Sequence, residues 1–187
     1  METLRREIPR MLLFGAAGRN LGKTELAVRM IEAYAKVRPV SAIKVVTVHD
    51  HGDICPRGGK GCGICKGLKS CFDIHEEHGE GEKDTMRFAR SGAQKVYLVR
   101  AFPEGLAEAM EAVCRQIPAG DVIICESNSV AGVVKPGMFF LIADETGAWK
   151  PSALAVREYA DELVHSDEES FVQILKMYGP NGKMALQ

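Results

Sequence analysis

The chain has 187 residues, of which 46% are hydrophobic and 26% are charged. That composition is typical of a globular domain and excludes a disordered chain, a fibrous repeat and a disulfide-rich miniprotein. With 24 basic and 25 acidic residues the formal net charge is −1, which gives no reason to expect nucleic acid or an anionic membrane as a partner. No apolar run approaches the roughly 20 residues that span a bilayer, and the N-terminus lacks the apolar core of a signal peptide. We therefore expect one domain over residues 1–187, in the cytoplasm, where cysteines are reduced thiols or metal ligands.

Short apolar runs alternate with segments of helical periodicity along most of the chain. The expected strands are 10–15, 39–48, 95–100, 121–126 and 138–143, with a short one near 163–164, and the expected helices are 23–37, 83–91, 103–117, one after Pro151, and 167–178. Continuous apolar strands separated by helices predict an α/β, three-layer fold with a mostly parallel central sheet flanked by helices. Residues 50–82 break every periodicity, and we expect an inserted cysteine-rich loop there.

The segment after the first expected strand has the spacing of a P-loop. Residues 15–24 read Gly-Ala-Ala-Gly-Arg-Asn-Leu-Gly-Lys-Thr, the pattern G-x-x-x-x-G-K-[ST] with Ala17 in place of the first glycine. Alanine is compatible with that position if its φ is negative. In a P-loop, backbone N–H groups wrap the phosphates, Lys23 neutralises the β- and γ-phosphates, and the Thr24 hydroxyl ligates Mg²⁺. The expected nucleotide-binding residues are Gly18, Arg19, Asn20, Leu21, Gly22, Lys23, Thr24 and Glu25. An ordinary glycine-rich turn is the alternative.

Carboxylates follow two of the expected strands. Asp50 lies between His49 and His51 after the second strand and could hold Mg²⁺ directly or through water, with a turn-forming aspartate as the alternative. Glu126 ends the strand 121–126, where a Walker B acid would orient a water or a metal hydrate. The expected catalytic residues are therefore Lys23, Asp50 and Glu126, and the expected magnesium ligands are Thr24, Asp50 and Glu126. Lys44, inside the second strand, would reach a phosphate, pair with an acid or lie on an edge strand.

Four of the six cysteines lie close together, with the spacing C-x6-C-x2-C-x5-C: they are Cys55, Cys62, Cys65 and Cys71. Four thiolates this close would repel one another unless a metal neutralised them. We expect a 4Fe–4S cluster, because the abundant glycine lets backbone N–H groups turn toward sulfur. Structural zinc is one alternative and free or redox-paired thiols are another. The neighbouring histidines could replace a cysteine as ligand: His49, His51, His75 and His78. Cys114 and Cys125 have apolar neighbours and are expected in the core.

Taken together, these motifs resemble the molybdopterin-guanine dinucleotide biosynthesis protein B (MobB) family of P-loop NTPases. The likeness covers roughly residues 10–150 and is carried by Gly18 to Thr24, by Ile43-Lys44 leading to His49-Asp50-His51, by Lys83-Asp84-Thr85-Met86-Arg87 followed by Ser91-Gly92-Ala93, and by Glu126. This resemblance implies a SIMIBI-type NTPase fold, usually dimeric, that binds ATP or GTP with Mg²⁺ and assists the maturation of a metal cofactor. The chain departs from the family at Ala17, at Ser127 (glycine in the family) and in the cysteine loop. Asp144 and Lys150 follow the strand where base-reading residues usually lie.

The expected function is Mg²⁺-dependent binding and slow hydrolysis of ATP or GTP, coupled to the four-cysteine metal site, in the biosynthesis of a metal or molybdopterin cofactor. The expected partners are a second copy of the chain and a metalloenzyme client or cofactor-biosynthesis protein. A small-molecule kinase built on the same P-loop is one alternative. A non-catalytic module that binds nucleotide and zinc is the other.

Overall fold

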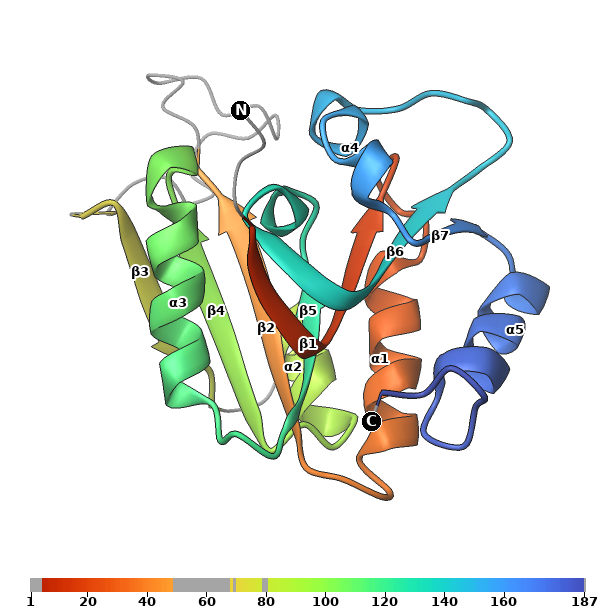
Figure 1. Ribbon diagram of the computed structural model, residues 1–187, viewed down its shortest axis with the longest axis horizontal. Coiled ribbons are helices and arrows are strands. Elements are labelled where there is room, and N and C mark those ends of the chain that lie inside the picture. The colour runs from red at the N-terminus through yellow and green to blue at the C-terminus, as the bar shows by residue number, and fades with distance from the viewer. Residues whose placement is uncertain (1–4, 49–67, 69, 79–80, 187) are drawn as a thin grey trace.

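The computed structural model describes residues 5–48, 68, 70–78 and 81–186. Within these residues seven strands form one sheet in the order β3-β4-β2-β5-β1-β6-β7 (Figure 1). The strands are β1 Arg6–Ala16, β2 Val40–Thr47, β3 Phe72–Glu76, β4 Lys95–Ala101, β5 Val122–Glu126, β6 Val134–Ala143 and β7 Glu162–His165. Neighbouring strands pair in parallel except β3, which runs antiparallel to β4.

Helices cover both faces of this sheet (Figure 1). They are α1 Lys23–Tyr34, α2 Asp84–Arg90, α3 Leu106–Gln116, α4 Pro151–Leu154 and α5 Glu168–Tyr178, with 3₁₀ turns η1 Pro103–Gly105, η2 Ser129–Gly132 and η3 Arg157–Tyr159. Helices α3 and α4 share one core cluster with the sheet, and α1, α2 and α5 share the other. The α/β, three-layer fold with a mostly parallel sheet is thus confirmed. None of the described helices is long and apolar enough to cross a membrane.

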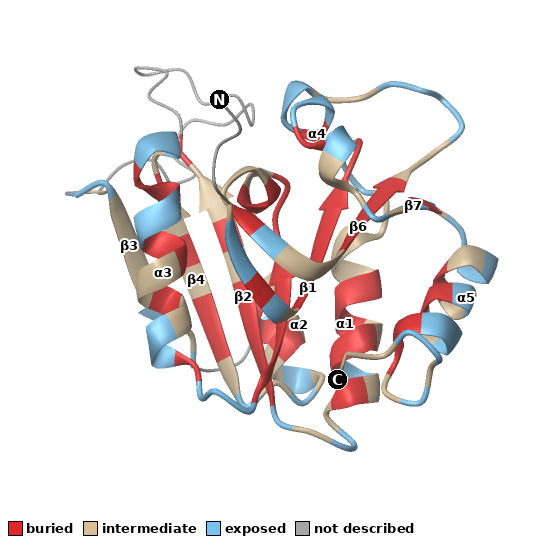
Figure 2. Ribbon diagram, viewed as in Figure 1, coloured by how far each residue is buried: buried red, intermediate tan, exposed pale blue. Residues whose placement is uncertain are grey.

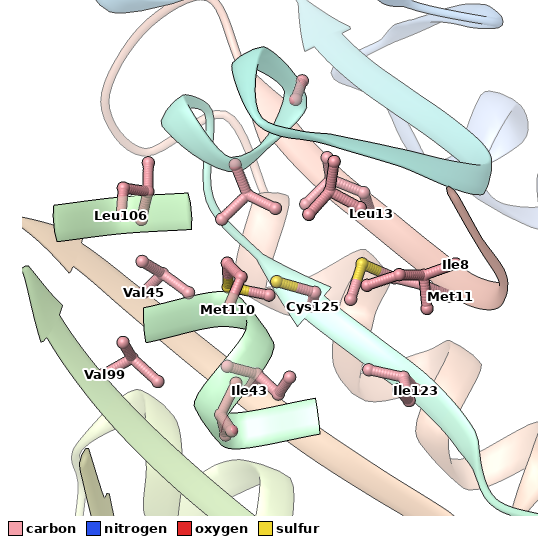
Figure 3. Packing of buried hydrophobic residues seen from close by; sticks show 14 of the residues in the cluster. Ile8, Met11, Leu13, Ile43, Val45, Val99, Leu106, Met110, Ile123 and Cys125 are labelled. Carbon is pink, nitrogen blue, oxygen red and sulfur yellow. The ribbon is translucent and has the colours of Figure 1, made fainter. Parts of the chain in front are cut away.

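The inner strand β1 shows why the apolar runs of the sequence are continuous. Residues 11–16 are all buried (Figure 2). Met11 and Leu13 belong to the cluster that contains α3, whereas Leu12 and Phe14 belong to the cluster that contains α1. Successive side chains of a strand point to opposite faces, so a strand covered on both faces needs apolar residues at every position. Figure 3 shows the first of these clusters at close range.

The structure departs from the sequence expectations mainly at boundaries. Strands β1 and β6 each begin four residues earlier than expected, and the helix expected over 103–117 is divided into η1 and α3. The larger difference is β3, which lies inside the stretch expected to lack regular structure. Its residues Phe72 and Ile74 pack against the core beside α3, and that packing holds β3 on the edge of the sheet.

The chain leaves the sheet after β2 and returns to it before β3 at nearly the same place. The Val48 N–H donates to the Ala101 carbonyl at 2.8 Å, and the Phe102 N–H donates to the Cys71 carbonyl at 2.9 Å. Gly105 allows this close approach, since a Cβ there would lie 2.7 Å from the Cys71 carbonyl oxygen. Val48 and Cys71 therefore both hydrogen-bond to two consecutive residues, Ala101 at the end of β4 and Phe102 just before η1.

Candidate nucleotide-binding site

Three neighbouring strands bring the expected site residues together. The sheet order places β5 between β2 and β1, and all three run in parallel, so their carboxyl ends lie at the same edge. Ligands of open α/β sheets bind at this edge. The turn between β1 and α1 starts there, Glu126 is the last residue of β5, and Lys44 pairs in register with Glu126.

The backbone of the β1–α1 turn has the features of an anion-binding loop. Asn20 and Gly22 have positive φ, at 57° and 81°. Gly22 is the N-cap of α1, and none of the described side chains caps that end. The first N–H groups of a helix have no partner within the helix and carry partial positive charge, so this end of α1 can bind phosphate oxygens.

Ala17 fits the position where a P-loop usually has glycine. It is not among the described residues with positive φ, which is the condition for alanine to replace glycine there. Its side chain is 1% exposed. Its N–H donates to the Ile142 carbonyl at 2.7 Å, and its carbonyl accepts the Lys150 N–H at 2.9 Å. The start of the turn is thereby tied to β6 and to the segment that follows it.

Glu126 is the centre of the polar cluster. Its side chain is only 1% exposed, and a buried carboxylate is costly unless it is paired. The Thr24 hydroxyl donates to Oε2 at 2.9 Å, while Lys23 Nζ lies 3.2 Å from Oε1. Lys44 Nζ donates to the same Oε1. The two invariant chemical groups of the P-loop pattern, the lysine and the hydroxyl, thus meet one carboxylate.

Lys44 links this carboxylate to α2. Its Nζ lies 2.7 Å from Oδ2 of Asp84, the first residue of that helix. Burial opposes ionisation of Asp84, but the hydrogen bond and the charge of Lys44 outweigh it and hold the pKa of Asp84 below its ordinary 3.8. Strand β2 lies between β4 and β5. Lys44 is therefore not on an edge strand, and of the three roles considered for it the structure shows pairing with acids.

Asn128 fixes the last residue of β1. Its Oδ1 accepts the Ala16 N–H and its Nδ2 donates to the Ala16 carbonyl, both at 2.9 Å. The preceding residue adds a backbone bond from the Ser127 N–H to the Phe14 carbonyl at 3.0 Å. Both side chains are buried. The Asn128 amide therefore positions the start of the phosphate loop without having to contact a ligand.

Glu25 and Leu21 hold the turn to its neighbours. Glu25 pairs with Arg29 at 3.0 Å and with Arg87 of α2 at 2.7 Å, and both partners lower the pKa of its carboxyl, the Arg29 hydrogen bond most. The Leu21 carbonyl accepts the Ser166 hydroxyl at 2.9 Å. Any contact of Glu25 with a nucleotide would therefore come from its backbone, since its side chain is engaged with two arginines.

Lys150 is a third lysine at this edge. Its backbone lies on the turn through the bond to Ala17. Burial lowers the pKa of Lys150 to about 8, and repulsion from Lys23 acts in the same direction, while Glu126 opposes the shift. From the sequence, Lys150 was expected only among the base-reading positions, and Asp84 was not expected to be a site residue. The register of β6 beside β1 brings Lys150 to the turn. The spacing of residues along the chain does not reveal that register.

The oxygen ligands near the turn suit Mg²⁺. Thr24 and Glu126 offer a hydroxyl and a carboxylate that already touch each other, and hard oxygen donors are what this ion prefers. Asp50, the third expected ligand, lies outside the described residues. So do Cys55, Cys62 and Cys65, whereas Cys71 is described and exposed.

Within the described part of the chain, no group of three or more His, Cys, Asp or Glu residues could hold a metal ion. His75 and His78 are exposed, and His75 lies 3.4 Å from Asp73. Cys125 is fully buried and Cys114 packs against the same cluster, as the sequence predicted. Figure 3 shows Cys125 among Met110, Val45 and Ile123. Burial raises the pKa of both thiols. The reactive thiolate form is therefore disfavoured, and both cysteines are poor nucleophiles.

Comparison of the chain with protein-family models finds no match, and neither do comparisons with curated proteins and with solved structures. The resemblance to the MobB family therefore stays a prediction that rests on the residues quoted for it.

Proposed function

We propose that this protein binds ATP or GTP with Mg²⁺, hydrolyses it slowly, and couples the nucleotide state to a metal site formed by Cys55, Cys62, Cys65 and Cys71. We further propose that it acts, as a homodimer of the MobB-like class, in the biosynthesis of a metal or molybdopterin cofactor. The cysteine site is proposed from the sequence, with a 4Fe–4S cluster as its first occupant and zinc as the second.

The observation that carries the nucleotide proposal is the meeting of Lys23 and Thr24 on Glu126. The lysine lies 3.2 Å and the hydroxyl 2.9 Å from the carboxylate oxygens, at a helix end that no side chain in the described part of the chain caps. An ordinary glycine-rich turn has no need to place a lysine, a hydroxyl and a buried acid together. A P-loop needs all three, because the lysine and the metal offset phosphate charge and the acid lies beside them.

Each residue has a defined task in the proposed reaction. The amides of the turn and Lys23 bind the phosphate chain and offset the negative charge that develops on transfer. Thr24 and Glu126 would hold Mg²⁺, which when bound neutralises phosphate charge. Glu126 also orients the attacking water. Lys44 pairs with Glu126 and connects it to Asp84.

The link to the cysteines is supported by the places of Lys44 and Asp84 in the chain. Lys44 lies in β2 and Asp84 begins α2, so the two residues bracket the stretch that contains all four cysteines. Their side chains meet at 2.7 Å beside Glu126. A phosphate that draws Lys23 away from Glu126 leaves that carboxylate to Lys44. The electrostatic environment of the Lys44–Asp84 pair then changes, and these two residues lie on either side of the cysteine-containing stretch.

Binding and hydrolysis by matched variants test the nucleotide proposal. Wild type should bind ATP or GTP only with Mg²⁺ and release inorganic phosphate. Glu126→Gln should keep binding and lower the hydrolysis rate by about 100-fold or more, and Lys23→Ala should weaken binding. Lys135→Ala is the control, since Lys135 lies at the opposite end of β6 and pairs with Glu7.

The alternatives give different products. Phosphate transfer to a metabolite without release of inorganic phosphate would identify a small-molecule kinase. Slow hydrolysis that Glu126→Gln leaves unchanged would identify a non-catalytic nucleotide-binding module. Absence of nucleotide binding in the wild type would refute the nucleotide proposal altogether.

Metal content tests the cysteine proposal. Protein purified without oxygen should be brown and contain iron and sulfide at about four per chain, and Cys71→Ser should lower both. One zinc per chain without colour would replace the cluster by a structural metal. Absence of both metals would refute the site.

A further inference from the structure

We propose that Ser166 is a positioning residue of the phosphate site and that it acts through the backbone of the β1–α1 turn. Its hydroxyl holds the peptide between Leu21 and Gly22 in the orientation that presents the Gly22 N–H to a bound phosphate. The inference rests on the proposed nucleotide binding and deepens it, because it names a residue outside the P-loop pattern on which phosphate affinity depends.

One hydrogen bond fixes the direction of this peptide. The Ser166 hydroxyl donates to the Leu21 carbonyl at 2.9 Å. The Leu21–Gly22 peptide bond is trans, and in a trans peptide the C=O of one residue and the N–H of the next point in opposite directions. The Gly22 N–H therefore points away from Ser166, and no group within the described part of the chain accepts a hydrogen bond from it.

This direction leads toward the site where Lys23 and Thr24 meet Glu126. In the sheet, β1 lies between β5 and β6, and β7 lies beyond β6. Ser166 comes directly after β7, whereas Glu126 ends β5. The two residues thus lie on opposite sides of β1, and an N–H that points away from Ser166 points toward the side of the Lys23–Thr24–Glu126 cluster. Backbone N–H groups that converge from such a turn bind anions.

The hydroxyl is needed because the turn itself does not select this orientation. Gly22 has a φ of 81°, but glycine adopts negative φ about as readily as positive φ. The residue therefore does not oppose rotation of the peptide that precedes it. A rotated peptide would turn the Leu21 carbonyl oxygen toward the phosphate, where the two oxygen atoms repel each other. The hydrogen bond from Ser166 stabilises the orientation that binds an anion.

Ser166 is itself held in place by the corner between β7 and α5. Its N–H donates to the Ala143 carbonyl of β6 at 2.9 Å. The next residue, Asp167, is the N-cap of α5, and its side chain accepts the Ser170 N–H at 2.7 Å. Figure 1 shows α5 beside α1, which begins at the turn. A side chain that orients a binding loop has to be fixed in this way by its own surroundings.

Affinity for phosphate with and without a nucleoside tests this role. The probes are ATP, GTP and inorganic pyrophosphate with Mg²⁺, measured by calorimetry on the full chain. Ser166→Ala should weaken binding of pyrophosphate and of the nucleotide by a similar factor of about 10-fold. It should leave the hydrolysis rate at saturating nucleotide within about twofold, because a contact present before and during phosphate transfer changes KM and not kcat. Ser166→Thr keeps the hydroxyl and should retain the affinity.

The matched control is Ser170→Ala, whose hydroxyl bonds to Asp167 at 3.0 Å and not to the turn. The amide of Gly22 gives a direct signal of the proposed contact. Pyrophosphate should shift the Gly22 amide proton resonance downfield in the wild type, as a new hydrogen bond to phosphate does, and Ser166→Ala should reduce this shift. Ser166→Cys, whose thiol is only a weak donor, should lose affinity as Ser166→Ala does, and cooperative thermal unfolding shows that each variant is folded.

Each other result overturns the inference. Unchanged affinity in Ser166→Ala, even with lower stability, would make Ser166 a structural residue alone. A loss for nucleotides without a loss for pyrophosphate would place Ser166 on the sugar or the base. An affinity of Ser166→Thr as weak as that of Ser166→Ala would exclude the hydroxyl as the cause. A wild type that binds pyrophosphate in a Ser166-dependent way but no nucleotide would keep the inference while the proposed function fails, and a wild type that binds neither would refute both.

Discussion

The Glu126 carboxylate accepts contacts from three donors on two oxygens, with both lysines on Oε1 and the Thr24 hydroxyl on Oε2. One negative charge therefore separates two positive ones. An anion entering the turn competes with Glu126 for Lys23, and the remaining Lys44 can hold Glu126 in place because it is also tied to Asp84. The lysine inside β2 thus keeps the acid fixed while the lysine of the turn changes partners.

Removal of the Asn128 amide should weaken the fold and the phosphate loop together. Asn128→Ala leaves the Ala16 N–H and carbonyl without their side-chain partners in a buried place, and an unsatisfied buried group costs about 1–3 kcal/mol. Urea unfolding should show a loss of that size, and nucleotide affinity should fall with it. Ser129→Ala, one position further on and partly exposed, is the control. Equal effects of the two substitutions would contradict the role given to Asn128.

The lowered pKa of Lys150 should appear in the pH dependence of stability. Below about pH 8 the lysine is charged in both the folded and the unfolded chain, so the folded state carries the full cost of the half-buried cation. As the pH rises from about 8 toward 10.5 the folded state loses the proton first, and the free energy of unfolding gains a contribution. The stability difference between Lys150→Met and wild type should therefore narrow over this range. A stability difference between the two proteins that stays constant with pH would contradict the lowered pKa of Lys150.

At the level of single residues the sequence predicted the groups of the P-loop and the acid after β5, because each is marked by its position at a strand end. It could not predict that Asp84 and Lys150 join them. Asp84 reaches the site only because α2 packs beside β2, and Lys150 only because β6 ends beside β1. Both facts depend on sheet order, which spacing along one chain does not encode.

Among the elements, α5 sets the geometry of the turn. Phe171 of α5 lies so close to Gly22 that a Cβ there would be 2.7 Å from its Cζ atom. The aromatic ring of Phe171, in the last of the described helices, therefore covers the N-cap of α1. Arg29 of α1 also pairs with Glu168 in the first turn of α5, at 2.6 Å.

Gly22→Ala should accordingly destabilise the protein for two separable reasons. The left-handed backbone at φ 81° costs an L-residue about 1–2 kcal/mol, and the methyl group meets Phe171. Chemical unfolding should show a loss above that range, and combining Gly22→Ala with Phe171→Ala should cost less than the two single losses added together. Gly120→Ala is the matched control, since a Cβ there meets no atom within 4 Å. A loss no larger than that of the control would exclude the proposed crowding.

Whether a segment forms a helix or a strand could be predicted where the apolar pattern continues over many residues, as in α1, β2 and β4. Strand β3 was missed although Phe72 and Ile74 alternate with Asp73 and His75. The alternation is short and follows a glycine-rich stretch without periodicity, so no feature of the sequence separated it from its surroundings. It becomes a strand because β4 offers it a partner and α3 covers its apolar side.

For the whole molecule, the sheet should not depend on the cysteine stretch. Val48 and Cys71 are held to adjacent residues at the end of β4, Ala101 and Phe102, so a short linker can join them. Replacing residues 49–70 by a few Gly and Ser residues changes the entropy of loop closure by only about 1 kcal/mol. We expect a cooperatively unfolding protein with native far-ultraviolet circular dichroism, nucleotide binding within a few-fold of wild type, and no bound iron.

The control for this replacement is the full-length chain with Ser at all four cysteine positions, which removes the thiols and keeps the loop. Hydrolysis lost in the shortened chain but kept in the serine chain would trace the loss to other residues of the stretch, with Asp50 the first to test. A shortened chain that fails to fold would show that the stretch contributes to the sheet itself.

The two hydrogen bonds that hold Val48 and Cys71 have a mechanical consequence. A partner that pulled on the chain between them would load the bonds to Ala101 and Phe102 first, in tension, before any force reached the paired backbone of β2 and β4. The Val48 bond lies ahead of Lys44 on the side of β2, and the Cys71 bond lies ahead of β3, so small pulls are absorbed at the end of β4. Only a displacement large enough to detach Val48 would be transmitted along β2 to the Glu126 carboxylate.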